Sequence, residues 1–253
     1  KKEYAVKIVD VTRALHQHRL FLITELRILS THKCPFIVAF KDAYFENKGL
    51  HIVTEYAAGG DLAHMIRVRG RRSHYFTAVD VWHYFLQICI AVDYLHQINV
   101  LHRDIKPANI LVTRDSNIKL ADVGVSKVMR TAKYTYTQVG TPLYMSPEVF
   151  RRERYDSKSD AWSVGCVLFE MMHLRPAFTG NNIMMLRNNI FRGHPRVSPR
   201  RYDRKLHDVM DALVTVQLRS RPSIRDVLSW PSVLDEMNRR GLTFAVAERE
   251  VKP

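Results

Sequence analysis

The sequence predicts an α+β chain with two lobes, a small strand-rich lobe at 1–56 and a larger helical lobe at 57–240. Apolar residues alternate with polar ones in the first lobe, whereas in the second they recur every three or four residues. The small residues 57–60, AAGG, form a flexible connection between the two patterns, and we place the lobe boundary there. Residues 241–253 have no clear periodicity and are predicted to form a tail.

The elements of the first lobe follow from the spacing of its apolar residues. Residues 1–10 alternate and predict a strand that carries Lys7. Leucines at helical spacing predict a one-faced helix over 22–31. Residues 36–44 and 50–55 then predict two further strands joined by a polar turn.

The second lobe is predicted to be mostly helical. A long amphipathic helix over 81–95 leads into a polar loop, and a short hairpin follows at 110–120. Residues 161–171 carry the pattern of a buried helix. Two more helices are predicted at 206–213 and 224–228.

Composition excludes several classes of protein. The chain has 253 residues and is 46% hydrophobic, so it can bury a sizeable core. Its three cysteines lie far apart without a C-x-x-C pair, which predicts neither a disulfide framework nor a zinc site. Scattered thiols of this kind are typical of a reducing compartment. No window resembles a membrane-spanning segment, so we expect no membrane partner.

The formal net charge is +14, which raises the question of an anionic partner. The first interpretation is that solvated Lys and Arg faces account for the charge, since such faces are common. Anionic scaffolds and acidic substrates are the alternatives. Nucleic acid is disfavoured as a partner, because the sequence has neither zinc-finger spacing nor an aromatic RNA-binding signature.

Residues 101–109, LHRDIKPAN, place a carboxylate, an ammonium and a carboxamide on one short loop. Phosphoryl transfer from ATP needs a base for the attacking hydroxyl, a cation beside the moving phosphate and an oxygen ligand for Mg²⁺. Asp104 is the candidate base, Lys106 the cation and Asn109 the ligand. Asp122 is a second candidate ligand, because Mg²⁺ prefers oxygen donors.

This loop belongs to an ordered set of motifs. It is preceded by YAVKIV at 4–9 and followed by DVG at 122–124, GTPLYMSPE at 140–148 and SDAWSVG at 159–165. The set resembles the eukaryotic protein kinases over nearly the whole chain. The resemblance implies a two-lobed protein kinase fold that uses ATP and Mg²⁺ as cofactors.

Finer features place the resemblance within one branch. Lys106 and the Gly-Thr-Pro at 140–142 are similar to the serine/threonine kinases, and residues 55–62, 144–148 and 158–166 are most similar to the NIMA-related (NEK) kinases. The resemblance implies a serine/threonine protein kinase that phosphorylates Ser and Thr hydroxyls of protein substrates. It also implies a cytoplasmic location with cytoskeletal or centrosomal association.

The resemblance further assigns a nucleotide site. Lys7 would contact the ATP phosphates and form an ion pair with Glu25. The remaining predicted contacts lie around the adenine and the ribose: Ala5 and Leu111 on the two faces of the adenine, backbone groups of Glu55 and Ala57 at its edge, and Asp61 at the ribose or a substrate side chain.

The resemblance also implies two structural features and a regulatory one. Glu148 and Arg221 would form a buried ion pair, and Asp160 would hold the catalytic loop. A regulatory phosphate is expected on Thr137, four residues before Thr141.

Arg103 and Lys127 are the cations expected to receive the phosphate on Thr137. The kinase that adds this phosphate would be an upstream kinase or another copy of the same protein. Such contacts would order the segment that carries Thr137, and this segment would then fix Asp104 relative to Asp122.

The sequence departs from the family pattern in two places. No G-x-G-x-x-G precedes Lys7, which we attribute to a fragmentary sequence, with a shortened, truncated N-terminal lobe as the alternative. Val123 replaces the usual Phe, and the smaller side chain would leave its apolar contact poorly filled, at a cost of about 1–2 kcal/mol. A catalytically weak pseudokinase that acts as a scaffold is therefore the alternative function.

Overall fold

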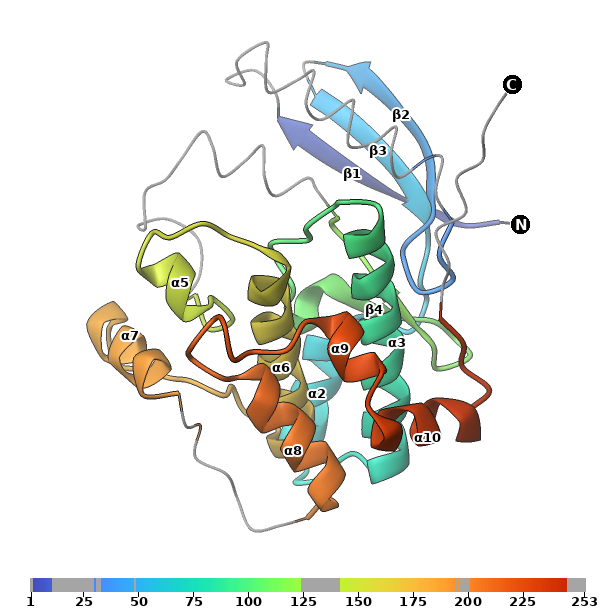
Figure 1. Ribbon diagram of the computed structural model, residues 1–253. Helices are drawn as coiled ribbons and strands as arrows, with labels where there is room; N and C mark the ends of the chain where they lie inside the picture. Colours follow the sequence, from blue (N-terminus) through green and yellow to red (C-terminus); the bar gives the residue numbers. More distant parts are fainter. Residues whose placement is uncertain are drawn as a thin grey trace.

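The computed structural model describes most of the chain, in these ranges: 2–10, 30, 33–47, 49–123, 142–193, 195 and 201–244. Figure 1 shows a small sheet at the top of the molecule and a larger group of helices below it. The structure is thus the α+β arrangement that the sequence predicts. The predicted helix at 22–31 lies almost entirely outside the described residues, as does most of the predicted tail.

The sheet contains β1 (Tyr4–Asp10), β2 (Phe40–Glu46) and β3 (Gly49–Glu55), hydrogen-bonded in the order β1-β3-β2. Both pairings are antiparallel, and Lys7 lies opposite Ile52 in the register. Successive side chains of a strand point to opposite faces, so Ala5 and Lys7 share one face of β1. The predicted strands at 1–10 and 50–55 are confirmed.

The strand predicted at 36–44 begins four residues later, at Phe40. The segment before it hydrogen-bonds to the helical part, since the Leu120 N–H donates to the Phe36 carbonyl at 2.8 Å and the Val38 N–H donates to the Leu120 carbonyl at 3.0 Å. Apolar alternation identifies extended backbone but not its partner. These bonds tie the sheet to the strand that precedes Asp122.

The larger part of the fold is built from helices, with bounds as follows: α2 (Leu62–Arg71), α3 (Ala78–Gln97), α5 (Pro147–Phe150), α6 (Ser157–His173), α7 (Ile183–Arg192), α8 (Arg204–Leu213), α9 (Ile224–Leu228) and α10 (Pro231–Arg239). The core lies where α3 and α6 pack together, with α8 and α9 against them. Trp82, Phe85, Trp162 and Phe169 are among its largest buried side chains. No helix in the described ranges is both long and apolar enough to cross a membrane.

Between α3 and α5 the chain forms a 3₁₀ turn, η1 (Pro107–Asn109), and a hairpin of β4 (Ile110–Val112) and β5 (Ile118–Leu120). Ile110 pairs with Leu120, so the hairpin brings the end of the predicted catalytic loop beside the start of the segment that carries Asp122. The Ala121 N–H also donates to the Asn109 carbonyl at 2.8 Å. The predicted hairpin is confirmed.

Helices α3, α6, α8 and α9 occur where apolar periodicity predicts them, whereas α2, α5, α7 and α10 were not predicted. The missed helices bury few residues. Helix α2 buries Leu62 and Ile66, and α7 buries Leu186 and Ile190. Two buried positions at i and i+4 are too few to stand out in a window of mixed polar residues.

Candidate active site

Three predicted catalytic side chains lie together on the loop that follows α3 and ends in η1. Lys106 Nζ lies 2.7 Å from Asp104 Oδ2. The Asn109 amide nitrogen Nδ2 donates to the same oxygen at 3.0 Å and to the Asp104 carbonyl at 2.8 Å. Asp104 is only partly buried, so its carboxylate is fixed in orientation while remaining accessible.

The buried Asp160 on α6 fixes the backbone of this loop. Its carboxylate accepts the His102 N–H at 3.0 Å and the Arg103 N–H at 2.9 Å. His96 and Tyr155 donate to the same carboxylate from their side chains. The carboxylate is fully buried, so these bonds replace the water that it would otherwise bind.

The donors around Asp160 also determine its charge state. Burial alone would raise the pKa of the Asp160 carboxyl, but the hydrogen bond and charge of His96, with the bond from Tyr155, lower this pKa below its ordinary value. The carboxylate therefore stays ionised and acts as an acceptor. The predicted role of Asp160 in holding the loop agrees with this geometry.

His102 connects the catalytic loop to the segment that carries Asp122. Its Nε2 donates to the Ala121 carbonyl at 2.9 Å, and its Nδ1 accepts the Asp104 N–H at 3.3 Å. Burial lowers the pKa of His102, in spite of the nearby carboxylates, so the ring is neutral with its proton on Nε2. One neutral imidazole thus joins Asp104 to the residue before Asp122.

Lys7 and Asp122 face each other between the sheet and the helical part, with Lys7 Nζ 2.6 Å from Asp122 Oδ1. Both side chains remain partly exposed, at 44% and 38%. Glu25, the predicted partner of Lys7, lies outside the described residues. Val123, beside Asp122, is buried at 5% exposure and packs in the main core.

The predicted Mg²⁺ ligands fit the ion by their chemistry. The Asn109 amide nitrogen donates twice to Asp104, so the side-chain carbonyl oxygen of Asn109 is the atom that remains as a metal ligand. Asp122 supplies an accessible carboxylate. Mg²⁺ is usually held by one or two carboxylates together with phosphate oxygens and water, so this small set suffices. The described residues contain no cluster of three or more His, Cys, Asp and Glu that would hold a metal independently.

The segment that joins the sheet to α2 contains the predicted adenine-edge residues. The Glu55 N–H donates to the Ala39 carbonyl at 3.0 Å, so only the carbonyl group of Glu55 remains for an adenine. The Glu55 side chain lies 2.7 Å from Lys119 of β5 and accepts the Ala39 N–H at 2.8 Å. Ala57 is buried.

The other predicted nucleotide contacts lie on both sides of the gap between the lobes. Ala5 on β1 and Leu111 on β4 are half-buried. Asp61 is the N-cap of α2, where its carboxylate accepts the His64 N–H at 2.7 Å. A cap of this kind is worth about 1 kcal/mol. Asp61 therefore has a structural role besides the predicted contact with ribose or substrate.

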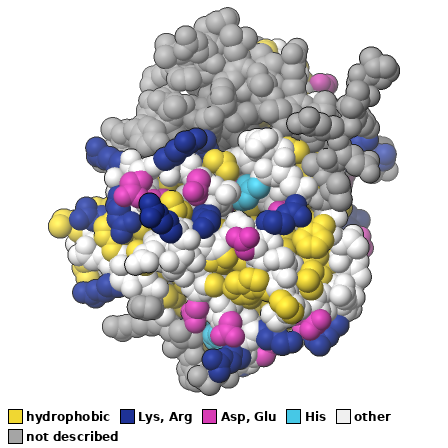
Figure 2. Space-filling model, viewed as in Figure 1, with side chains coloured by type: hydrophobic (Ala, Val, Ile, Leu, Met, Phe, Trp, Pro, Cys, Tyr) yellow, Lys and Arg dark blue, Asp and Glu magenta, His cyan; other side chains and the backbone are white. Residues whose placement is uncertain are grey.

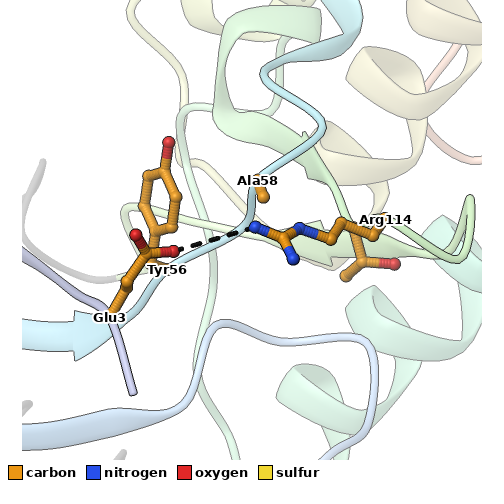
Figure 3. Close-up of a pocket in the computed structure, with 5 residues that line it drawn as sticks. Glu3, Tyr56, Ala58 and Arg114 are labelled. Carbon is orange, nitrogen blue, oxygen red and sulfur yellow. Dashed lines mark ion pairs between the residues drawn. The ribbon is translucent and has the colours of Figure 1, made fainter. Parts of the chain in front are cut away.

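A pocket of about 370 Å³ lies beside this connecting segment (Figure 3). It is lined by Glu3, Tyr56, Ala58, Thr113 and Arg114. Figure 3 shows the Arg114 guanidinium directed toward Glu3, at 4.0 Å. The lining includes none of the catalytic-loop residues, so the pocket is an opening at the outer side of the lobe junction and not the reaction centre.

The predicted ion pair between Glu148 on α5 and Arg221 is present and buried. Two guanidinium nitrogens of Arg221 meet the two carboxylate oxygens at 2.9 and 3.1 Å. Ser159 donates to the same carboxylate at 2.6 Å. Burial opposes ionisation, but Arg221 and Ser159 outweigh it and lower the pKa of Glu148.

Of the four predicted regulatory residues, the structure describes one. Arg103 is described, and its guanidinium lies over the Tyr155 ring, 5.8 Å from the centroid. Thr137, Lys127 and Thr141 lie outside the described residues.

Sequence reasoning missed three residues around the site. His96 and Tyr155 donate to Asp160, and Lys119 pairs with Glu55. His96 and Asp160 are 64 residues apart, and no periodic pattern links them. The one sequence signal is in β5, where Lys119 lies between two buried apolar residues. This alternation indicates that Lys119 points to the opposite face of the strand, where it could meet a polar partner.

Comparison with known proteins agrees with this geometry. The protein kinase domain family matches residues 1–233. Serine/threonine-protein kinase Nek1 of Mus musculus is 35% identical over 90% of the chain, and Nek5 of Homo sapiens is 35% identical over 98%. Probable serine/threonine-protein kinase nek2 of Dictyostelium discoideum is 33% identical over 90%.

The chain spans only part of each of these relatives, namely 19% of Nek1, 35% of Nek5 and 56% of nek2. The match nevertheless covers nearly the whole chain, and the motifs on which the sequence resemblance rests lie within it. The resemblance to protein kinases, and to the NIMA-related branch among them, is thereby confirmed. The chain belongs to the protein kinase family.

Proposed function

We propose that the chain transfers the γ-phosphate of Mg·ATP to Ser and Thr hydroxyls of protein substrates. The observation that carries this proposal is the geometry of the catalytic loop, in which Lys106 and Asn109 both reach Asp104 Oδ2, at 2.7 and 3.0 Å. Three side chains of the required chemistry, fixed on one loop, form the arrangement that phosphoryl transfer uses. The names of the similar proteins, all serine/threonine-protein kinases, support the substrate class.

In this proposal each side chain of the loop has one task. Asp104 accepts the proton of the substrate hydroxyl as the hydroxyl oxygen attacks the γ-phosphorus, and ADP leaves as the bond between the γ-phosphorus and its bridging oxygen breaks. Lys106 neutralises charge that develops on the transferred phosphoryl group. Asn109 holds Asp104 in place through its amide nitrogen and keeps its carbonyl oxygen for the metal.

The nucleotide would lie between the sheet and the helical part. Lys7 and Asp122 are close enough to act on the same phosphates, and both are accessible. Asn109 and Asp122 would hold Mg²⁺, which would supply positive charge to offset the negative charge of the phosphates. Ala5 and Leu111 would contact the adenine, and Glu55 and Ala57 would offer backbone groups at its edge.

Regulation by phosphorylation of Thr137 is part of the proposal. A phosphate brings about −1.5 to −2 charge and three strong acceptor oxygens. Arg103 adjoins Asp104, so a phosphate held by its guanidinium, with Lys127, would act next to the catalytic base. Loop order of this kind is a known consequence of phosphate–arginine pairing.

Paired substitutions test the proposal. Asp104→Asn should lower kcat by about 10²–10⁴-fold with little change in ATP affinity, because the base acts on the substrate hydroxyl. Asp122→Ala should abolish the rise in Tm that Mg·ATP causes. Asp115→Asn, at an exposed turn of the β4–β5 hairpin, is the matched control and should behave like wild type.

The outcomes separate the two candidate functions. Equal stabilisation of wild type and Asp122→Ala by Mg·ATP would mean that the metal site is wrongly assigned. Nucleotide binding without transfer to any protein substrate would favour the pseudokinase. The observation that motivates this alternative is Val123, which stands where the family pattern has Phe.

A further inference from the structure

Two segments that are distant in the sequence meet at one end of the helical part. The Tyr202 hydroxyl donates to the Phe76 carbonyl at 2.9 Å, and the Arg201 guanidinium lies over the Tyr75 ring, 4.0 Å from its centroid. Figure 1 shows α3 and α8 reaching the lower end of the molecule. The contacts therefore bring the connection between α2 and α3 beside the first turn of α8.

The surface formed by these two segments is basic. Residues 67–80 and 201–208 hold seven Lys and Arg side chains but three Asp. We call this surface the basic face and define it by its cations: Arg67, Arg69, Arg71, Arg72, Arg201, Arg204 and Lys205. Figure 2 shows Lys and Arg side chains along the lower edge of the molecule, with Asp and Glu side chains among them.

The carboxylates of these segments leave most of the positive charge unpaired. Asp80 and Asp203 act as helix caps, where each accepts a backbone N–H. Asp208 lies 3.7 Å from Arg204, and both of these side chains are exposed to solvent. The other cations of the basic face form no ion pair with any residue of the described ranges. A surface of this kind attracts anionic partners.

The stability of the fold does not explain where all these cations lie. Arg69 and Arg71 belong to the last turn of α2, where positive charge interacts favourably with the helix dipole. Arg204 and Lys205 begin α8 instead, and positive charge at the start of a helix is unfavourable by the same reasoning. Local rules of this kind are broken mainly at functional sites. The cations at the start of α8 therefore indicate a binding role.

Aromatic rings hold two of the arginines in place. The Arg69 guanidinium lies 4.3 Å from the centroid of the Phe76 ring, and Arg201 is held in the same way by Tyr75. A guanidinium is planar, and it can bind one carboxylate through two parallel N–H bonds. Less side-chain entropy is lost on binding when the guanidinium is already held. The basic face thus offers forked donors in fixed positions.

The apolar residues beside these cations discriminate between anionic partners. Phe76 and Tyr202 are buried, and Val68 and Tyr75 are half-buried, so segments 67–77 and 201–205 expose no Phe, Tyr or Trp ring. Single-stranded nucleic acid binds largely by stacking its bases on aromatic rings. Membrane-surface helices insert apolar side chains besides their cations. A run of carboxylates needs neither feature and uses the cations alone.

We propose that the basic face binds an acidic segment of a protein partner, a run of Asp and Glu that lies across the end of α2 and the start of α8. Arg71 contacts this run from one segment and Arg201 from the other. The basic face lies at the opposite end of α2 from Asp61. Binding there needs neither ATP nor the catalytic loop, so it stands apart from the proposed phosphoryl transfer.

Fluorescence anisotropy with the purified protein, without nucleotide, tests the proposal. The probe is a fluorescein-labelled oligoglutamate peptide, and the comparison peptide is oligoglutamine of the same length. The glutamate peptide should bind and the glutamine peptide should not. Binding should be lost as the salt concentration rises from about 0.1 to about 1 M, because the Debye length falls from about 10 to about 3 Å.

Charge reversal separates the basic face from the net charge of the protein. Arg71→Glu and Arg201→Glu should each weaken binding about fivefold or more, and their effects should multiply in the double variant. Arg192→Glu at the end of α7 and Arg219→Glu after α8 change the net charge equally at exposed positions elsewhere and should retain wild-type affinity. Tm measured for every variant shows that each is folded, as expected for exposed side chains.

Hydrogen exchange of the wild-type protein gives a test that needs no variant. The glutamate peptide should protect backbone amides at the end of α2 and at the start of α8. No binding of this peptide, equal weakening in the control variants, or protection at another part of the surface would overturn the proposal. Tighter binding of a DNA duplex or of phosphatidylserine vesicles, lost in Arg71→Glu and Arg201→Glu, would overturn it in favour of those partners.

Discussion

The Arg103 backbone N–H donates to the buried Asp160 carboxylate at 2.9 Å, and Arg103 has a φ of 67°. A left-handed conformation in a residue other than glycine costs of order 1–3 kcal/mol and persists only where the surroundings enforce it. Asp160 holds Arg103 in this conformation, because its carboxylate accepts the N–H groups of both Arg103 and the preceding His102. The helix α6 thus fixes the backbone from which Asp104 projects.

Removal of the Asp160 carboxylate should therefore release the catalytic loop. Asp160→Ala leaves buried donors unsatisfied, at about 1–3 kcal/mol each, so we expect a loss of at least about 3 kcal/mol in the free energy of unfolding. Asp160→Asn keeps one oxygen acceptor and should lose less, while kcat still falls. Urea denaturation and a kinase assay measure the two effects. Equal stability of Asp160→Ala and wild type would contradict the anchoring role.

The Glu148–Arg221 pair gives a second test, in a different part of the fold. Arg221→Ala leaves the buried Glu148 carboxylate without its cation and should cost about 3–5 kcal/mol. Arg221→Lys should also destabilise, because an ammonium cannot form the two parallel bonds at 2.9 and 3.1 Å. Exposed Arg219→Ala is the control and should change stability by less than about 0.5 kcal/mol. Thermal and urea unfolding of these variants measure the loss of stability that the ion pair predicts.

The catalytic loop was predictable because its information is local. Asp104, Lys106 and Asn109 lie within six residues, so the motif alone brings them together. The β4–β5 hairpin was predictable for the same reason, since two short apolar runs flank one polar turn. Within such short segments, the covalent chain itself keeps the interacting residues close to each other.

Other contacts could not be predicted, because they depend on tertiary packing. Lys7 meets Asp122 across 115 residues, a contact that no local pattern predicts. Phe36 lies in a turn and the next residue, Ile37, pairs with Leu120 of β5, whereas the apolar alternation suggested a longer β2. Helix α7 was missed because it buries only Leu186 and Ile190. In each case the deciding partner lies far away in the sequence.

Stability should decrease as the pH falls from about 7.5 to 5.5, because His102 and His173 are buried and burial lowers the pKa of both. The unfolded chain then takes up protons near its ordinary histidine pKa, of about 6.5, while the folded chain does not. Each residue contributes a slope of up to about 1.4 kcal/mol per pH unit. The contribution is complete above this range and is lost progressively as the pH falls through it.

Urea unfolding across this range measures the effect. His173→Asn should flatten the pH dependence, whereas exposed His64→Asn should leave it unchanged. A separate loss of stability is expected below about pH 4. The pKa values of Asp160 and Glu148 are lowered in the fold, so protonation of these carboxylates in this range removes their hydrogen bonds and the ion pair of Glu148. An identical slope in wild type and His173→Asn would exclude His173 as a source of the decrease.

The proposed regulation predicts that Thr137→Ala lowers kinase activity at least about tenfold, because no phosphate is then available to order the loop beside Asp104. Arg103→Ala should remove the benefit of phosphorylation while keeping the backbone N–H that Asp160 accepts. Its stability should therefore stay close to that of wild type, which separates it from Asp160→Ala. Thr131→Ala, in the same segment, serves as the control. Mass spectrometry of the active enzyme identifies the modified residue, and full activity with Thr137 unmodified would refute this mechanism of regulation.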